Sequence, residues 1–184
     1  MYAGHFAAGL ALKAAEPRAP TWGILLGVGL LDVLFGVFLI LGIEHATITP
    51  GIAPGFRLDF IDWSHSFVMA LVWGGIYGAF FLRQSKVAAA VCGFAVFSHF
   101  VLDFFMHPRD LAFWPYAEGH FGLGLWSLWP KGWWFFELLF IAVCLGYYLS
   151  RARRRRTFGG RAAYACLVVV LLHVVNSPWL SPTH

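Results

Sequence analysis

Long apolar runs separated by short polar stretches are the feature that most limits how this chain can fold. Hydrophobic residues make up 60% of the 184 residues and charged residues only 12%, about half the charged fraction of a typical soluble domain. A bilayer core is crossed by roughly 20 apolar residues in an α-helix, which satisfies its own backbone hydrogen bonds there. We therefore expect an all-α integral membrane protein, one domain over residues 1–184 with about five transmembrane helices. The expected spans are 22–43, 61–82, 87–106, 133–149 and 162–178.

The basic residues indicate how such a bundle is oriented. They gather at Lys13 and Arg18, at Arg83 and Lys86, and in the loop 151–156. With five spans these three groups fall on the same side, and the positive-inside rule makes that side cytoplasmic. The loops 44–60 and 107–131 then lie outside, which predicts a multi-pass membrane protein. If the cell is Gram-negative, these loops lie in the periplasm and the membrane is the inner one.

The sequence pI of about 9.2 does not indicate a nucleic-acid partner, because the basic residues are confined to these loops. Membrane lipids are the expected partners, and a larger membrane complex or a homo-oligomer remains open. A further apolar run, residues 2–12, would form about 16 Å of helix. That is too short to cross a bilayer, so we expect a half-inserted helix packed on the bundle.

Residues 98–110, reading S-H-F-V-L-D-F-F-M-H-P-R-D, place polar groups in the third span. On a helix His99, Asp103 and His107 are four residues apart and share one face. An acidic residue at mid-membrane costs roughly 2.5–3.5 kcal/mol on translocon scales. A divalent metal ion would offset this cost, since imidazole nitrogen and carboxylate oxygen are its usual ligands.

Other apolar segments carry ionisable residues at a similar depth. Counting about 1.5 Å of rise per residue, His5, Asp32 and His65 fall in the same slab as His99 and Asp103, between the midplane and the outer leaflet. The expected metal ligands are His5, Asp32, His65, His99, Asp103 and His107.

Several polar residues near this slab have two interpretations. Ser66 adjoins His65 and would orient a substrate or a water, or else bond back to its own helix. Asp62 and Asp110 fit a helix cap and a loop charge as well as a site. Glu137 and His173 would take part in the site or only bond a neighbouring helix.

An ordered set of short motifs covers the chain up to about residue 126. It comprises G-H-F-A-A-G-L-A-L-K near the N-terminus, L-L-D in the first span, S-H-S at 64–66, S-H-F-V-L-D at 98–103, and then H-P-R-D-L and G-L-G-L-W. This set resembles the bacterial multi-pass proteins known as membrane-bound metal-dependent hydrolases. The resemblance implies that metal is carried by His5, Asp32, His65, His99 and Asp103. Residues 108–110 read P-R-D where R-P-D is the more familiar order, so the resemblance leaves the roles of His107 and Asp110 open.

Three functions fit this pattern. The first is a hydrolase that binds zinc or a similar ion and acts on a lipidic substrate, with Asp103 or Asp32 as general base, Ser66 beside the site and residues 107–131 as a lid. The second is a non-enzymatic accessory subunit of a larger electron-transfer or pigment complex. The third is a transporter or proton relay, for which five spans are few and no inverted repeat is visible.

Overall fold

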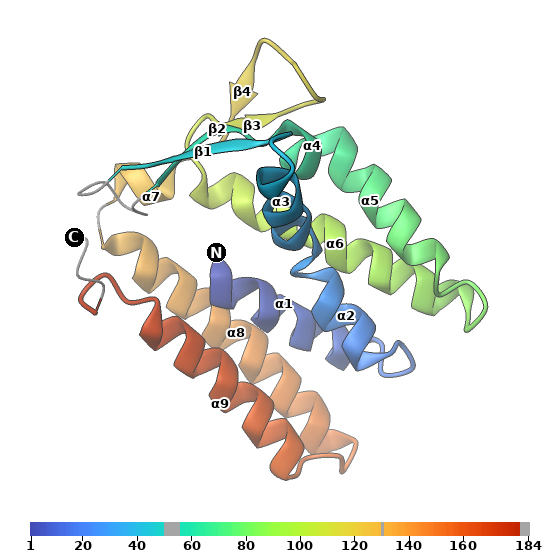
Figure 1. Cartoon of the computed structure of the whole chain (residues 1–184). Coiled ribbons are helices and arrows are strands. Elements are labelled where there is room, and N and C mark those ends of the chain that lie inside the picture. Colours follow the sequence, from blue (N-terminus) through green and yellow to red (C-terminus); the bar gives the residue numbers. More distant parts are fainter. Residues whose placement is uncertain (50–55, 130, 181–184) are drawn as a thin grey trace.

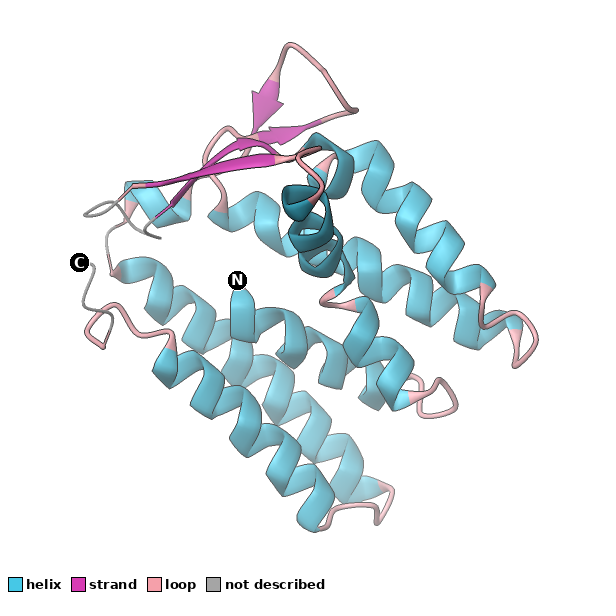
Figure 2. Ribbon diagram, viewed as in Figure 1, coloured by secondary structure: helices cyan, strands magenta, loops and turns pink. Residues whose placement is uncertain are grey.

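The computed structural model describes residues 1–49, 56–129 and 131–180, and these are mostly helical (Figures 1 and 2). The helices are α1 (Tyr2–Ala15), α2 (Thr21–Gly27), α3 (Leu30–Ile40), α4 (Asp62–His65), α5 (Phe67–Ala79), α6 (Lys86–Met106), α7 (Leu125–Leu128), α8 (Gly132–Arg154) and α9 (Gly160–Val175). Two antiparallel two-stranded sheets pair β1 (His45–Ile48) with β2 (Phe56–Phe60) and β3 (Leu111–Ala112) with β4 (His120–Phe121). The helical class expected from the sequence is confirmed.

Two of the helices, α6 and α8, are long and apolar enough to cross a membrane. The pair α2 and α3 would make a third span, although the two helices meet at an angle of 50°. Helices α5 and α9 are apolar but shorter. The structure thus supports two or three spanning helices by length and composition, where the sequence predicts about five.

Two of the expected spans are interrupted. The run 22–43 breaks between α2 and α3 at Val28 and Gly29, which belong to neither helix. The run 61–82 breaks at Ser66, which has an extended backbone with φ −90° and ψ 156°. The Ser66 hydroxyl accepts a hydrogen bond from the amide of Met69 and so caps α5, as serine commonly does at a helix N-terminus.

Helix α1 lies inside the helical assembly, between the pair α8 and α9 and the helices α2 and α6 (Figure 1). Its small residues allow this position: Ala3, Ala7 and Gly9 are buried. Helix α1 continues to Ala15, beyond the apolar run that predicts it, and it packs against four helices. It therefore lies among the helices, where the sequence leads us to expect a helix packed on the bundle.

The two long connections contain more structure than the sequence predicts. Residues 44–60 form the hairpin of β1 and β2, except for 50–55, which lie outside the described residues. Residues 107–131 contain β3, β4 and α7. Helix α3 ends just before Gly42, whose φ of +69° suits a residue without a side chain. The amide of Ile43 bonds back to the carbonyl of Phe38 and that of Gly42 to Leu39, which is the Schellman arrangement.

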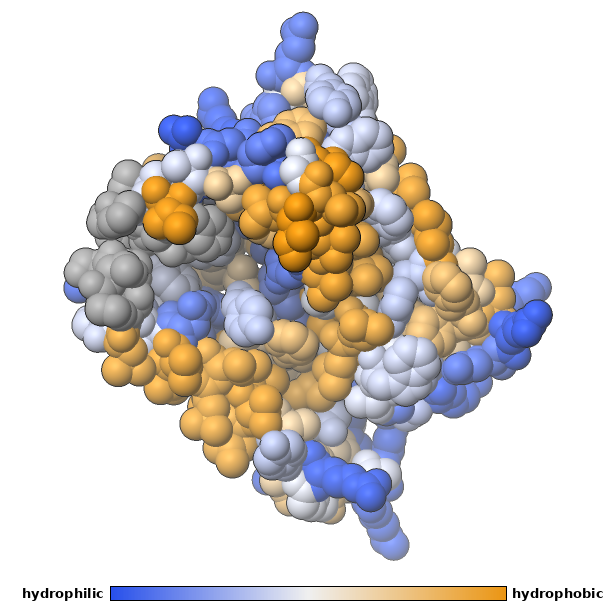
Figure 3. Space-filling view, in the orientation of Figure 1, coloured by the Kyte–Doolittle hydropathy of each residue, from blue (hydrophilic) through white to orange (hydrophobic). Residues whose placement is uncertain are grey.

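The molecular surface separates into an apolar flank and polar ends. In Figure 3 apolar side chains cover the sides of the helices, whereas hydrophilic ones gather over the strands and at the loops on the opposite end. The connections that carry the basic groups, α1–α2, α5–α6 and α8–α9, lie at the helix ends farthest from the strands (Figure 1). This separation is what a helical protein in a bilayer requires.

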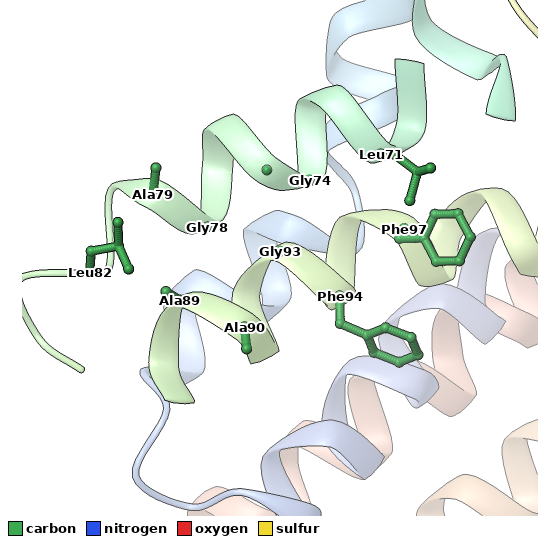
Figure 4. A pocket seen from close by; sticks show the side chains of 11 residues that line it. Leu71, Gly74, Gly78, Ala79, Leu82, Ala89, Ala90, Gly93, Phe94 and Phe97 are labelled. Carbon is green, nitrogen blue, oxygen red and sulfur yellow. The ribbon is translucent and has the colours of Figure 1, made fainter. Parts of the chain in front are cut away.

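Helices α5 and α6 approach closely through small residues (Figure 4). A Cβ atom placed on Gly78 would lie 2.6 Å from the carbonyl oxygen of Ala89, and one on Gly74 would lie 2.9 Å from that of Gly93. Such contacts are typical of membrane helices, which pack by close backbone approach. Gly75, one residue along α5, has no atom of the described residues within 4 Å of its Cβ position.

The substitution Gly78→Ala is expected to destabilise the protein, because the new methyl group meets backbone that cannot move without separating the helices. Overpacking of this kind costs about 1–3 kcal/mol. The matched control is Gly75→Ala, which has open space and gains about 1 kcal/mol of helix propensity. Thermal unfolding in detergent, followed by circular dichroism, should give a lower midpoint for Gly78→Ala alone. Equal midpoints for the two variants would contradict the packing described.

Candidate metal centre

Helix α6 supplies the core of the polar cluster. His99 and Asp103 are four residues apart on its buried face, with residue exposures of 0% and 2%. His107 follows directly as the C-terminal cap of the helix, where its backbone becomes extended before Pro108. The helical period that predicts a shared face therefore holds for His99 and Asp103 and reaches His107 at the end of the helix.

The two carboxylate oxygens of Asp103 are the meeting point of four histidines. Oδ1 lies 3.1 Å from Nε2 of His5. Oδ2 lies 2.9 Å from Nε2 of His99, 3.6 Å from that of His65 and 3.8 Å from that of His107. The rings of His5 and His99 are stacked, with centroids 3.7 Å apart. Residues from α1, α4 and α6 thus converge on one acidic group.

The N-terminal ammonium group is also in contact with this carboxylate. The nitrogen of Met1 lies 3.3 Å from Oδ1 of Asp103, and both groups are buried. Oδ1 therefore faces the first turn of α1, whereas Oδ2 faces the other three histidines.

Asp32, on α3, completes the cluster from the other side. Its Oδ1 lies 3.5 Å from Nε2 of His99 and 3.7 Å from Nε2 of His65. The sequence predicts a buried carboxylate here, but the side chain of Asp32 is 48% exposed. The bend between α2 and α3 turns this part of the apolar run toward the surface, so Asp32 is the member of the cluster that the surroundings reach.

In His99 and His107 the ring nitrogen that faces away from Asp103, Nδ1, lies against an oxygen atom. Nδ1 of His99 is 2.7 Å from the carbonyl oxygen of Val28, at the break between α2 and α3. Nδ1 of His107 is 3.0 Å from Oδ1 of Asp110. A carbonyl or an ionised carboxylate only accepts, so Nδ1 is the donor in each ring, and in the neutral form of the ring the lone pair is on Nε2, the nitrogen on the side of Asp103. This is the arrangement in which proteins hold metal-ligating histidines.

The surroundings of the histidine Nε2 atoms near Asp103 show whether a metal ion fits the cluster. Although Nε2 of His99 is 2.9 Å from Asp103, it makes no hydrogen bond to any described residue, and Nδ1 of His5 is also without a partner among them. A buried nitrogen that faces a carboxylate without bonding to it suits a shared cation. Two overlapping sets have their ligand atoms within 4.8 Å of one another: His5, His99 and Asp103, and Asp32, His65 and His99. These buried groups can hold a metal ion.

The other residues singled out by the sequence lie elsewhere. Ser66 caps α5, and its hydroxyl makes no hydrogen bond to the cluster in the part of the chain that is described. Glu137 on α8 is wholly buried, accepts a hydrogen bond from the amide of Gly4 at 2.8 Å, and lies 3.4 Å from Nδ1 of His173. Glu137 and His173 therefore form a separate pair that joins α1, α8 and α9.

Asp62 lies on α4 beside His65 but has different partners. Its carboxylate accepts a hydrogen bond from the amide of Tyr116 at 2.9 Å and lies 3.3 Å from Nε2 of His120. Asp62 therefore attaches the connection 107–131, which follows α6, to helix α4. The same connection covers the cluster, because the ring of Trp126 on α7 lies 4.6 Å from that of His107.

Sequence reasoning misses Glu44, which it assigns to an exposed loop. Glu44 is fully buried, and its carboxylate accepts hydrogen bonds from the amide and the hydroxyl of Ser64, both at 2.7 Å. Burial raises the pKa of Glu44 above its ordinary value, against the opposing effect of these two hydrogen bonds. No motif marks Glu44, since only the turn at Gly42 brings it back against α4.

Comparison of the chain with protein-family models, with curated proteins and with solved structures finds no match. The function of the cluster must therefore be inferred from its residues and their geometry.

The substitution Asp103→Asn is expected to abolish metal binding, because it removes the charge on which four imidazoles converge. Glu137→Gln is the matched control, since it also neutralises a buried carboxylate that contacts α1. Both proteins would be purified in detergent, incubated with excess Zn²⁺, desalted and measured by elemental analysis. We expect stoichiometric zinc in the wild type and in Glu137→Gln, and none in Asp103→Asn. Retention of zinc by Asp103→Asn would show that Asp103 is not a ligand.

Proposed function

We propose that the chain is a membrane-embedded, metal-dependent hydrolase that acts on a lipidic or membrane-associated substrate. The observation that carries this proposal is the convergence of the Nε2 atoms of four histidines on the buried carboxylate of Asp103. The resemblance of the ordered motifs to membrane-bound metal-dependent hydrolases supports the same function.

The residues divide between holding an ion and handling protons. His5, His65, His99 and Asp103 are the enclosed members of the cluster and would hold the ion. A divalent cation there would supply positive charge that polarises a phosphoryl or carbonyl oxygen, and Zn²⁺ suits this mixture of ligands. Asp32 is half exposed and can accept a proton from an attacking water. His107, beside Trp126, is placed to donate a proton to the leaving group when its ring is protonated on both nitrogens.

The position of the cluster in α6 favours a substrate at the membrane surface. Asp103 is 17 residues from Lys86, where α6 begins next to a basic connection, which corresponds to about 26 Å along the helix. If the basic connections are cytoplasmic, the cluster lies in the outer half of a bacterial inner membrane. A lipid headgroup or its linkage is found at that depth. The connection with β3, β4 and α7 would then cover the site from outside.

Hydrolysis of phospholipid by the purified protein would test this proposal. The protein would be reconstituted into vesicles of phosphatidylglycerol and phosphatidylethanolamine, and released water-soluble phosphate or headgroup would be measured. Release should disappear after chelation, return with Zn²⁺, and be absent in His99→Ala. Glu137→Gln, outside the cluster, should retain it. Release that survives chelation, or that equals release by His99→Ala, would contradict a metal-dependent reaction at this cluster.

A further inference from the structure

Glu44 and Ser64 form a buried chain of hydrogen bonds that ends on one ring of the metal centre. The carboxylate of Glu44 accepts from the amide of Ser64 through Oε1 and from its hydroxyl through Oε2, each at 2.7 Å. The Ser64 hydroxyl oxygen lies 2.7 Å from Nδ1 of His65. Glu44 and Ser64 both have 0% exposure, and His65 has 4%. Water therefore does not compete for these bonds.

The number of protons available determines which group donates in each hydrogen bond between Glu44, Ser64 and His65. The Ser64 hydroxyl has one proton, and the oxygens within its reach, Oε2 of the ionised Glu44 at 2.7 Å and the carbonyl of Ile61 at 3.3 Å, are acceptors. Once that proton is donated, the hydroxyl oxygen can only accept from His65. The proton of the neutral imidazole must therefore be on Nδ1, and the lone pair of Nε2 faces Asp32 and Asp103 at 3.7 and 3.6 Å.

We propose that Glu44 is a positioning residue of the metal centre, which acts through Ser64 to hold His65 with its proton on Nδ1 and its Nε2 free to bind a divalent cation. The inference rests on the proposed metal centre for its purpose, but the state of the ring can be measured without metal. In His99 and His107 the same task is performed by Val28 and Asp110. In His65 it requires two residues, because the group next to Nδ1 is a hydroxyl, which can donate as well as accept.

The contrast with Asp62 separates positioning from mere support of α4. Asp62 is also a buried carboxylate that accepts a backbone amide, that of Tyr116, and it lies in the same short helix as His65. Its bonds lead to the connection that comes after α6 and away from the ring of His65. Loss of either carboxylate would loosen α4. Only loss of Glu44 would change which nitrogen of the His65 ring carries the proton.

The decisive variant is Glu44→Gln, which keeps the shape of the side chain and can keep the bond from the Ser64 amide. Its amide group facing the Ser64 hydroxyl would donate, so the hydroxyl proton would turn toward Nδ1 of His65 and favour the tautomer with the proton on Nε2. The first measurement is ¹⁵N NMR of histidine-labelled, metal-free protein in detergent, with His65 assigned by its absence from His65→Ala. We expect Nδ1–H in the wild type and in Asp62→Asn, and a shift toward Nε2–H in Glu44→Gln. An Nε2–H ring in the wild type, or an unchanged ring in Glu44→Gln, would overturn the inference.

The second measurement is titration with Co²⁺, monitored by its visible absorption. Loss of a residue that orients a ligand lowers metal affinity about 10–100-fold, so Glu44→Gln and Ser64→Ala should each show a decrease in this range. Asp62→Asn should not, and Glu44→Gln should have no further effect in a His65→Ala background. An equal decrease in Asp62→Asn would identify Glu44 as structural support only. A wild type that binds no Co²⁺ but has the Nδ1–H ring would refute the metal centre and leave the role of Glu44 in fixing the ring standing.

Discussion

The buried carboxylate of Asp103 is the constraint on which the arrangement of this chain depends. A negative charge with 2% exposure inside an apolar helix would be prohibitively unfavourable alone. Here it is in contact with four imidazoles and the ammonium group of Met1. These partners come from α1, α4, α6 and the residue that ends α6, so satisfying one acid brings together segments that are far apart in the sequence. A cation at this point would bind all of them at once.

Helix α1 is central to that arrangement although it is short. Its small residues let it lie among α2, α6, α8 and α9. From this position His5 reaches Asp103, and the amide of Gly4 reaches Glu137 on α8. Two buried carboxylates on different helices, Asp103 and Glu137, thus both find a polar partner in the first turn of α1. This links the cluster around Asp103 to the pair of Glu137 and His173 without a shared side chain.

Helical periodicity and the cost of burying charge predict much of the cluster around Asp103. They bring out His99 with Asp103 on one face, and they select His5 and His65 because an ionisable group in an apolar run needs a partner. They do not predict the bend between α2 and α3, which exposes Asp32, because nothing in an unbroken apolar run shows where it will bend. The two serines beside His65 cannot be distinguished by spacing, since the choice depends on the extended backbone of Ser66. Glu44 reaches the site only through the tertiary path set by Gly42, which no local pattern encodes.

The bend at Val28 has a consequence for how the protein tolerates sequence change. The atom that holds His99 there is a main-chain oxygen, which every amino acid at position 28 would supply. The Val28 side chain is itself fully buried in the hydrophobic core, but the hydrogen bond to His99 depends on the angle between α2 and α3. In a straight helix the carbonyl oxygen of Val28 would accept a backbone hydrogen bond within the helix and would no longer hold the His99 ring. The bend in the backbone, rather than the side chain at position 28, therefore keeps this ring in place.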